Sequence, residues 1–161
     1  MNKQKGATLI EVIIYTFLSL ALILILTDIF SQLLSKSNES VSLSEVEIDG
    51  KFISQKIYNQ LAAATGISLP ANLGDSANSF IFAIDSTNYS YTQSGTNLFL
   101  NDGVTNERLN GYGTEISGLT ATRLGNSGGK PVLKISFNIK SSIIQPKGPE
   151  SKDYSITAGI R

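Results

Sequence analysis

Glu11 is the single charged residue in an apolar run of 20 residues that extends from Ala7 to Leu26. Placing a carboxylate inside a bilayer span costs roughly 2.5–3.5 kcal/mol on insertion scales, so such a residue normally has a functional role and a partner. Hydrocarbon screens a charge pair far less than water does, which would strengthen the attraction to a cation. The simpler alternative is that the Glu11 side chain only reaches back to the nearby membrane surface.

Catalysis has few candidate residues in this chain. It contains no cysteine and no histidine, which removes the thiol nucleophile, disulfides, and the commonest general base and metal ligand. The Ser-rich segments offer hydroxyl groups without a base beside them. We therefore predict that the protein is not an enzyme and uses no cofactor.

Four acidic residues stand in or beside expected loops: Asp75, Asp85, Asp102 and Glu107. Such loops bind calcium when several oxygen ligands converge on one point. The chain has no spaced Asp-x-Asp-x-Asp run that would supply those ligands. We therefore interpret these acidic residues as turn formers, and we predict no metal site.

Two further groups of side chains could bind a ligand. The first is aromatic and comprises Tyr89, Tyr91 and Phe99. Alternation puts the two tyrosines on one strand face, which favours packing over ligand binding. The second is basic and comprises Lys130, Lys134 and Lys140. With a net charge of zero and no basic patch, we expect no contact with nucleic acid.

The apolar run predicts a membrane-spanning helix. Twenty residues at ~1.5 Å each give ~30 Å, the thickness of a bilayer's hydrocarbon core. Lys3 and Lys5 precede the run and Asp28 follows it, which favours a cytoplasmic N-terminus and an extracytoplasmic C-terminal part. A cleaved signal peptide is the competing interpretation, but its apolar core is shorter and ends at a small-residue site that is missing here.

The segment Gly6-Ala7-Thr8-Leu9-Ile10-Glu11-Val12, followed at once by the apolar span, resembles the processing site of type IV pilins and type II secretion pseudopilins. The resemblance implies cleavage between Gly6 and Ala7 by a prepilin peptidase, N-methylation of Ala7, and an assembly role for Glu11. Residues 1–6 would be the leader peptide. The family usually begins its mature chain with Phe or Met, and Ala7 departs from that pattern.

The same resemblance implies partners and a location. Other pilins or pseudopilins would contact the N-terminal helix, and the Glu11 carboxylate would meet the N-terminal amine of a neighbouring subunit. The resemblance also implies three further partners: the prepilin peptidase, an inner-membrane assembly platform and the lipid bilayer before assembly. The protein would be single-pass in the cytoplasmic (inner) membrane before assembly, and part of a cell-surface or periplasmic filament afterwards.

Helical periodicity continues beyond the membrane span. Apolar residues recur at spacings of three, four and seven as far as Leu61, and Gly66 is a natural C-cap. One helix over residues 7–64 is predicted, with a transmembrane half at 7–30 and an amphipathic half in the segment 31–66. A Ser-rich linker at 35–44 between two helices is the alternative. The charges of the second half, Glu39, Glu45, Glu47, Asp49, Lys51 and Lys56, are interpreted as a solvated face.

From Phe80 onward, short apolar or alternating segments are separated by turn signals, as in an antiparallel sheet. Asn101-Asp102-Gly103 is the strongest hairpin signal among them. The clean alternation over 132–140 puts one set of apolar residues on one face: Leu133, Ile135, Phe137 and Ile139. The predicted strands are 80–84, 88–92, 97–100, 104–109, 115–124 interrupted at Gly118, 132–140 and 153–160.

The expected fold class is α+β and pilin-like: a long N-terminal helix, transmembrane in its first half, packed on a β-rich domain at 67–161. Strand segments 118–121 and 133–137 resemble those of minor pseudopilins of the J or W type. The sequence thus predicts a minor pilin or pseudopilin, a structural subunit that enters or primes a type IV pilus-like or type II secretion filament. The alternative is a signal-anchored surface protein whose β-domain binds a ligand without polymerising.

Overall fold

The computed structural model describes residues 8–126 and 128–160 and has an α+β fold. One helix, α1 (Leu9–Ala63), precedes strands that all pair antiparallel in the described part of the chain. The chain divides into two compact units, one ending at Asn38 and the other beginning at Glu39.

Helix α1 is continuous over 55 residues, including the Ser-rich stretch 35–44. The prediction of one helix over 7–64 is confirmed for the described residues, and the two-helix alternative is wrong. The helix ends at Ala63, and Gly66 is not its cap. Instead Thr65 donates from its backbone N and its Oγ1 to the carbonyl of Ala83, at 2.8 and 3.1 Å, and Gly66 already begins a strand.

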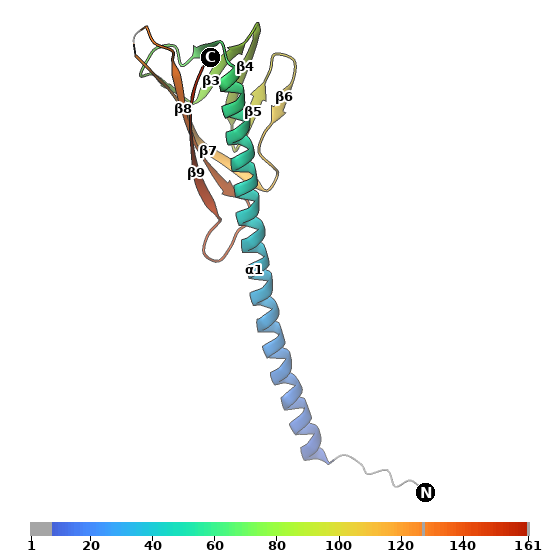
Figure 1. The fold of residues 1–161 in the computed structure, drawn as a ribbon. Coiled ribbons are helices and arrows are strands. Elements are labelled where there is room, and N and C mark those ends of the chain that lie inside the picture. The colour runs from blue at the N-terminus through green and yellow to red at the C-terminus, as the bar shows by residue number, and fades with distance from the viewer. Residues whose placement is uncertain (1–7, 127, 161) are drawn as a thin grey trace. The chain divides into compact units, whose positions relative to one another are not determined.

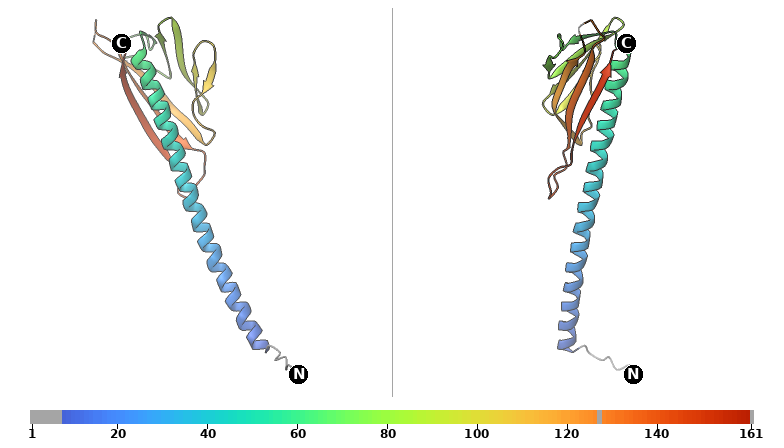
Figure 2. Two further views of the ribbon diagram at one scale, coloured as in Figure 1. Left: turned by 45° about the vertical axis from the view of Figure 1, so that its right-hand side comes forward. Right: turned by 60° about the vertical axis from the view of Figure 1, so that its left-hand side comes forward.

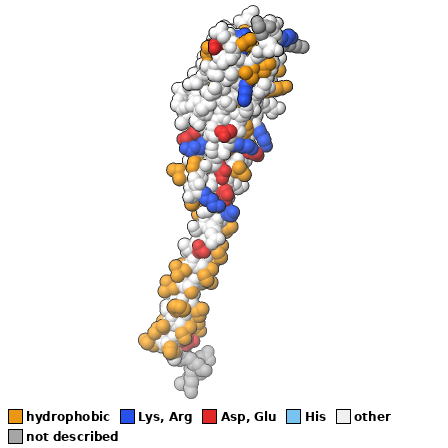
Figure 3. All heavy atoms as spheres, turned by 90° about the vertical axis from the view of Figure 1, so that its left-hand side faces the viewer, with side chains coloured by type: hydrophobic (Ala, Val, Ile, Leu, Met, Phe, Trp, Pro, Cys, Tyr) orange, Lys and Arg blue, Asp and Glu red, His pale blue; other side chains and the backbone are white. Residues whose placement is uncertain are grey.

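The first unit presents apolar side chains to the solvent along its part of α1. An 18-residue window of this helix has a mean hydropathy of 2.7, and none of it is buried. Figure 3 shows hydrophobic side chains along this stretch. By length and composition, α1 can cross a membrane, so the coarse prediction of a membrane anchor is consistent with the structure.

The second unit carries two antiparallel sheets, which lie on one side of its part of α1 (Figure 2). The larger sheet has the order β1-β3-β4-β5-β6 and the smaller one β2-β7-β8-β9. The strands are β1 (Gly66–Leu69), β2 (Ser76–Ala77), β3 (Ser79–Ile84), β4 (Thr87–Ser94), β5 (Asn97–Asn101), β6 (Asn106–Arg108), β7 (Thr114–Leu124), β8 (Val132–Ser141) and β9 (Ser151–Gly159).

The longer strands agree with their predicted positions, but two short ones were not expected. Strands were predicted only from Phe80 onward, whereas β1 already extends to Leu69 and β2 begins at Ser76. In β7 the pairing with β8 shifts between Ser117 and Thr120, and Gly118 lies there at φ 64°. The predicted interruption at Gly118 is therefore a β-bulge, which glycine permits because it has no Cβ.

The core of the second unit joins α1 to both sheets. From the helix it takes Val46, Ile53, Ile57 and Leu61, at the three- and four-residue spacing of one helical face. The larger sheet contributes Phe80, Phe82, Tyr91 and Leu98, and the smaller one Ile116, Leu133, Ile135, Phe137 and Ile139. Each fully buried apolar side chain contributes about 1.5–3 kcal/mol, so the sheets hold this part of the helix firmly.

Candidate functional site

Glu11 lies in the first turn of α1 and is exposed. Its backbone N and that of Val12 donate to the Thr8 carbonyl, at 3.0 and 3.2 Å. The hydroxyl of Tyr15, one turn on, donates to the Glu11 carboxylate at 3.3 Å. That hydrogen bond orients the carboxylate but does not neutralise it, so the group retains a need for a cation in an apolar medium.

The chain offers Glu11 no cation along the rest of the apolar helix. From Ala7 to Ser35 the sequence contains no Lys or Arg, and Lys36 is the first basic residue after the span. The predicted processing residues Gly6 and Ala7, with the leader 1–6, lie outside the described residues. A partner for the carboxylate therefore has to come from the chain's N-terminal end or from another molecule.

Two threonines of the apolar part of α1 form hydrogen bonds within the helix. Thr16 Oγ1 donates to the carbonyls of Val12 and Ile13 at 3.0 and 2.9 Å, and Thr27 Oγ1 donates to Ile23 at 2.8 Å. This back-bonding removes the cost of placing hydroxyl groups in a medium without water. The Glu11 carboxylate is the only charge in the apolar run from Ala7 to Leu26, and no hydrogen bond within the helix neutralises it.

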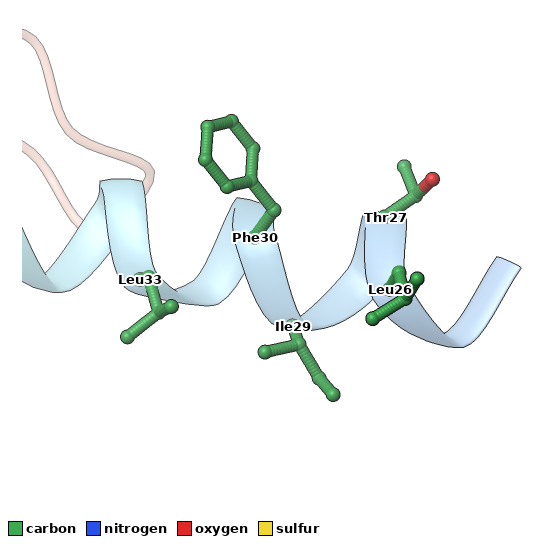
Figure 4. A pocket seen from close by; sticks show the side chains of 5 residues that line it. All are labelled: Leu26, Thr27, Ile29, Phe30 and Leu33. Atoms are coloured by element: carbon green, nitrogen blue, oxygen red, sulfur yellow. The ribbon is translucent and has the colours of Figure 1, made fainter. Parts of the chain in front are cut away.

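A shallow apolar notch lies on the same unit near the end of the span (Figure 4). Its lining comprises Leu26, Thr27, Ile29, Phe30 and Leu33. All five come from consecutive turns of α1, so the notch is a surface feature of one helix and encloses nothing. Notches of this kind accept the side chains of a second helix.

In the second unit, acidic side chains of α1 bind the β-domain. Asp49 Oδ2 accepts hydrogen bonds from the backbone N of Gly111, at 2.7 Å, and from the Thr114 hydroxyl. Lys56 pairs with Glu107 of β6 at 2.7 Å. The interpretation of these charges as a solvated face is therefore wrong for Asp49 and Lys56, because β6 and the loop that follows it pack against this flank of the helix.

Glu47 is held between two ammonium groups. Lys152 of β9 lies 2.9 Å and Lys51 of α1 lies 3.3 Å from the Glu47 carboxylate. Lys152, and then Lys51, hold the pKa of Glu47 below its ordinary value, and Glu47 in turn raises the pKa of Lys152. The pair links α1 to β9 at the surface, where solvent screening limits its contribution.

The loop acids act as turn residues. Asp102 Oδ1 accepts hydrogen bonds from the backbone N of Val104 at 2.9 Å and of Thr105, and these bonds lower the pKa of Asp102. Asp75 Oδ2 accepts from the backbone N and the side chain of Asn72. Glu107 is committed to its ion pair with Lys56. Among the described residues, no group of three or more acidic side chains could hold a metal ion.

Of the aromatic group, Tyr91 lies in the core and Tyr89 packs against it, as their alternation indicated, whereas the half-buried Phe99 is not part of that core. Tyr91 is fully buried and stacks on Phe80, with ring centroids 4.7 Å apart, while Tyr89 packs on Phe82. The Tyr91 hydroxyl donates to Gln60 of α1. Burial raises the pKa of Tyr91, and the nearby negative charge of Glu107 adds to this effect. The buried ring of Tyr91 is therefore not available to a ligand.

Among the described residues, no contact joins the three lysines of the basic group into one patch. Lys130, Lys134 and Lys140 are exposed, and Lys140 pairs with Glu115 at 3.6 Å.

Two features of the second unit were not predicted. Gly50 in the middle of α1 faces Tyr154, and Tyr112 projects into solvent from the loop before β7. The sequence carries a signal for each of these features: a glycine within the apolar stripe of the helix, and a tyrosine between two glycines. The first indicates a close approach and the second an exposed turn.

No family model, curated protein or solved structure matches this chain.

Proposed function

We propose that the chain is a structural subunit of minor pilin or pseudopilin type, which enters or primes a type IV pilus-like or type II secretion filament. The observation that carries the proposal is Glu11, an exposed carboxylate in a membrane-length apolar helix that has no basic residue before Lys36. A simple membrane anchor does not need such a charge, whereas in an assembly of parallel helices the charge can bind a cationic group of a neighbour.

The proposed role of Glu11 is to bind the N-terminal amine of a neighbouring subunit. Cleavage between Gly6 and Ala7 removes Lys3 and Lys5 and creates an amine four residues before Glu11. In a row of parallel helices, the amine of one copy lies beside the carboxylate of the next. The pair is weakly screened in hydrocarbon, so it both selects the neighbour and fixes the axial offset.

The exposed apolar surface of α1 supports the same role. Before assembly the bilayer solvates this surface, and afterwards neighbouring helices cover it. The notch formed by Ile29, Phe30 and Leu33 with its neighbours suits side chains of such a helix. Prepilin peptidase and an inner-membrane assembly platform are the other partners of the proposal, with the N-terminus cytoplasmic and the β-domain outside. The role is structural, and no catalysis is proposed.

The first test is the N-terminal mass of the full chain produced with its cognate prepilin peptidase. We expect a chain that begins at N-methyl-Ala7, and we expect Gly6→Ala to abolish cleavage. An unprocessed Met1 terminus in both chains would contradict the proposal and leave a signal-anchored surface protein as the better account.

The second test separates processing from assembly. Glu11→Gln keeps the shape of the side chain and removes its charge, so cleavage should be normal while the amount of chain in sheared filaments falls at least tenfold. Tyr15→Phe removes the hydroxyl that binds Glu11 and is the matched control, with little change expected. Filament yield that is unaffected by Glu11→Gln would exclude the assembly role of the carboxylate.

A further inference from the structure

Tyr112 is a solvent-exposed aromatic residue on a rigid support. It is 95% exposed, at the tip of the loop between β6 and β7. The loop is fixed to α1 by the hydrogen bond from Gly111 N to Asp49, and Arg108 donates to the Gly111 carbonyl at 2.6 Å. The Arg108 guanidinium also lies 4.7 Å from the Tyr112 ring centroid. A preordered, exposed aromatic side chain is typical of the centre of a protein interface.

A shallow, open groove lies between α1 and β9 in the same unit. Lys51, Ser54 and Tyr58 line it from the helix, and Tyr154 and Ile156 line it from the strand. Strand β9 is the outermost strand of its sheet, so one of its edges has no partner strand in the described part of the chain. Figure 1 shows β9 beside this part of α1. The groove offers apolar walls and free backbone groups to an incoming side chain.

Tyr112 and the groove are on opposite flanks of the helix. At about 100° per residue, Asp49 lies about 70° to one side of the buried stripe that includes Val46 and Ile53. Ser54 and Tyr58 lie about 70–110° to the other side. A projection on one flank and a recess on the other cannot meet within one copy. They can meet between copies, and such a head-to-tail contact repeats indefinitely.

Charge favours this pairing. Beside Tyr112, the side chains of Glu45, Asp49 and Arg108 leave a surplus of negative charge. Beside the groove, Glu47 with Lys51 and Lys152 leaves a surplus of positive charge. Opposite surpluses on the two surfaces steer the copies together and disfavour like-to-like pairing.

The axial positions of the two surfaces define an offset. The Tyr112 loop is fixed to α1 at the level of Glu45 and Asp49, whereas the groove is centred near Ser54. These levels are about seven residues apart, or ~11 Å at 1.5 Å per residue.

We propose that Tyr112 of one copy inserts into the α1–β9 groove of a second copy, with the two chains parallel and staggered by about 11 Å. The copy that supplies Tyr112 is displaced toward the C-terminal end of α1 relative to the copy that supplies the groove. This inference rests on the proposed function and extends it, because it makes a second copy of this chain a direct neighbour.

Disulfide trapping tests the contact. Because the sequence contains no native cysteine, only the introduced cysteines of this chain can cross-link its copies. Gln55 of α1 also lines the groove. The full chain with Tyr112→Cys and Gln55→Cys is produced in the cells that naturally make it and is oxidised mildly. We expect a ladder of dimers, trimers and larger species, because each copy carries both halves of the contact. Each single variant should give no species beyond a dimer. Val104→Cys with Gln55→Cys is the matched control, since Val104 is 92% exposed but lies elsewhere.

A ladder of equal strength from the control pair, or cross-links only to a different protein, would overturn the proposal. Tyr112→Ala supplies a second readout: loss of an interface anchor should weaken the contact about 30-fold and reduce filament yield accordingly. If Glu11→Gln abolishes filaments while Tyr112→Ala and the cysteine pair have no effect, the groove contact is wrong and the proposed function stands. If Glu11→Gln and Gly6→Ala change nothing while the ladder forms, copies associate through Tyr112 in a protein that is not a processed pilin.

Discussion

Gly50 of α1 lies directly under the phenol ring of Tyr154 in β9. A Cβ atom at position 50 would overlap the ring carbons and the hydroxyl of Tyr154. That hydroxyl donates to the Val46 carbonyl at 3.2 Å, one turn earlier on the helix. The ring also stacks on Phe137 of β8, with centroids 5.6 Å apart. The missing side chain of Gly50 is therefore what allows the smaller sheet to reach the helix backbone.

Gly50→Ala should destabilise the β-domain even though alanine favours a helix by up to ~1 kcal/mol. The added methyl has to displace the Tyr154 ring from Phe137, and such overpacking costs about 1–3 kcal/mol. Thermal unfolding of the full chain in detergent micelles, followed by the near-UV circular dichroism of its tyrosines, measures the loss.

The control for that change is Gly66→Ala, because a Cβ at Gly66 has nothing within 4 Å. A double-mutant cycle adds a sharper criterion. In a Tyr154→Ala background the clash is absent, so Gly50→Ala should become neutral or stabilising. Equal effects of Gly50→Ala in both backgrounds would show that the ring is not the cause.

Asp49→Asn should loosen the loop that carries Tyr112. The carboxylate accepts two hydrogen bonds, from Gly111 N and from the Thr114 hydroxyl, and bonds to a charged group contribute about 1.5–3 kcal/mol each. Amide hydrogen exchange at Gly111 should accelerate at least tenfold, whereas exchange in β3 should be unchanged. Asp85→Asn is the control, since Asp85 stands in an exposed turn at φ 52° that asparagine also tolerates.

Most of the fold could be predicted from the periodicity of the apolar residues. The spacing of Ile53, Ile57 and Leu61 predicted part of the buried helical face, but Val41, Ile48 and Phe52, which recur at the same spacings, are exposed. The alternation of 132–140 predicted the buried face of β8. Both signals are strong because one side of each element meets a core and the other side meets solvent. Strands β1 and β2 were missed because elements of four and two residues are too short to establish an alternation.

The candidate site was predictable only in part. Glu11 was evident because a carboxylate in an apolar run violates the local pattern. Asp49 was not, since a charge on an amphipathic helix is usually solvated and only the fold shows that it meets the Gly111 amide. Tyr112 was missed for a related reason: its exposure depends on where the neighbouring loop residues anchor, which is a tertiary property.

The ion pair between Glu47 and Lys152 predicts pH-dependent stability. The pKa of Glu47 is lowered in the folded chain, so its contribution is present above the ordinary value of 4.5 and is lost as the pH falls through the folded value. The pKa of Lys152 is raised, so its contribution is present below 10.5 and is lost as the pH rises beyond the folded value. Stability from this pair is therefore greatest between these limits.

Lys152→Gln tests this dependence. The carboxyl pKa of Glu47, measured by NMR titration, should rise in the variant while remaining below 4.5, because Lys51 still lies 3.3 Å away. Lys134→Gln, which removes an exposed lysine of β8, should leave that pKa unchanged. A Glu47 pKa that is equal in the wild type and in Lys152→Gln would mean that the pair does not form in solution.

Tyr91→Phe should cost about 1 kcal/mol at neutral pH, because Phe keeps the stack on Phe80 but leaves Gln60 without its hydrogen-bond donor. The difference should change with alkaline pH. Burial raises the pKa of Tyr91 above its ordinary value of 10.0, so the folded chain retains a proton that the unfolded chain releases. The wild type therefore loses stability above pH 10, and its advantage over the Tyr91→Phe variant should shrink there and then reverse. Urea unfolding at pH 8 and pH 11 measures both differences, with the exposed Tyr58→Phe as the control. A Tyr91 difference that is constant across this range would show that the hydroxyl ionises as freely in the folded domain as in water.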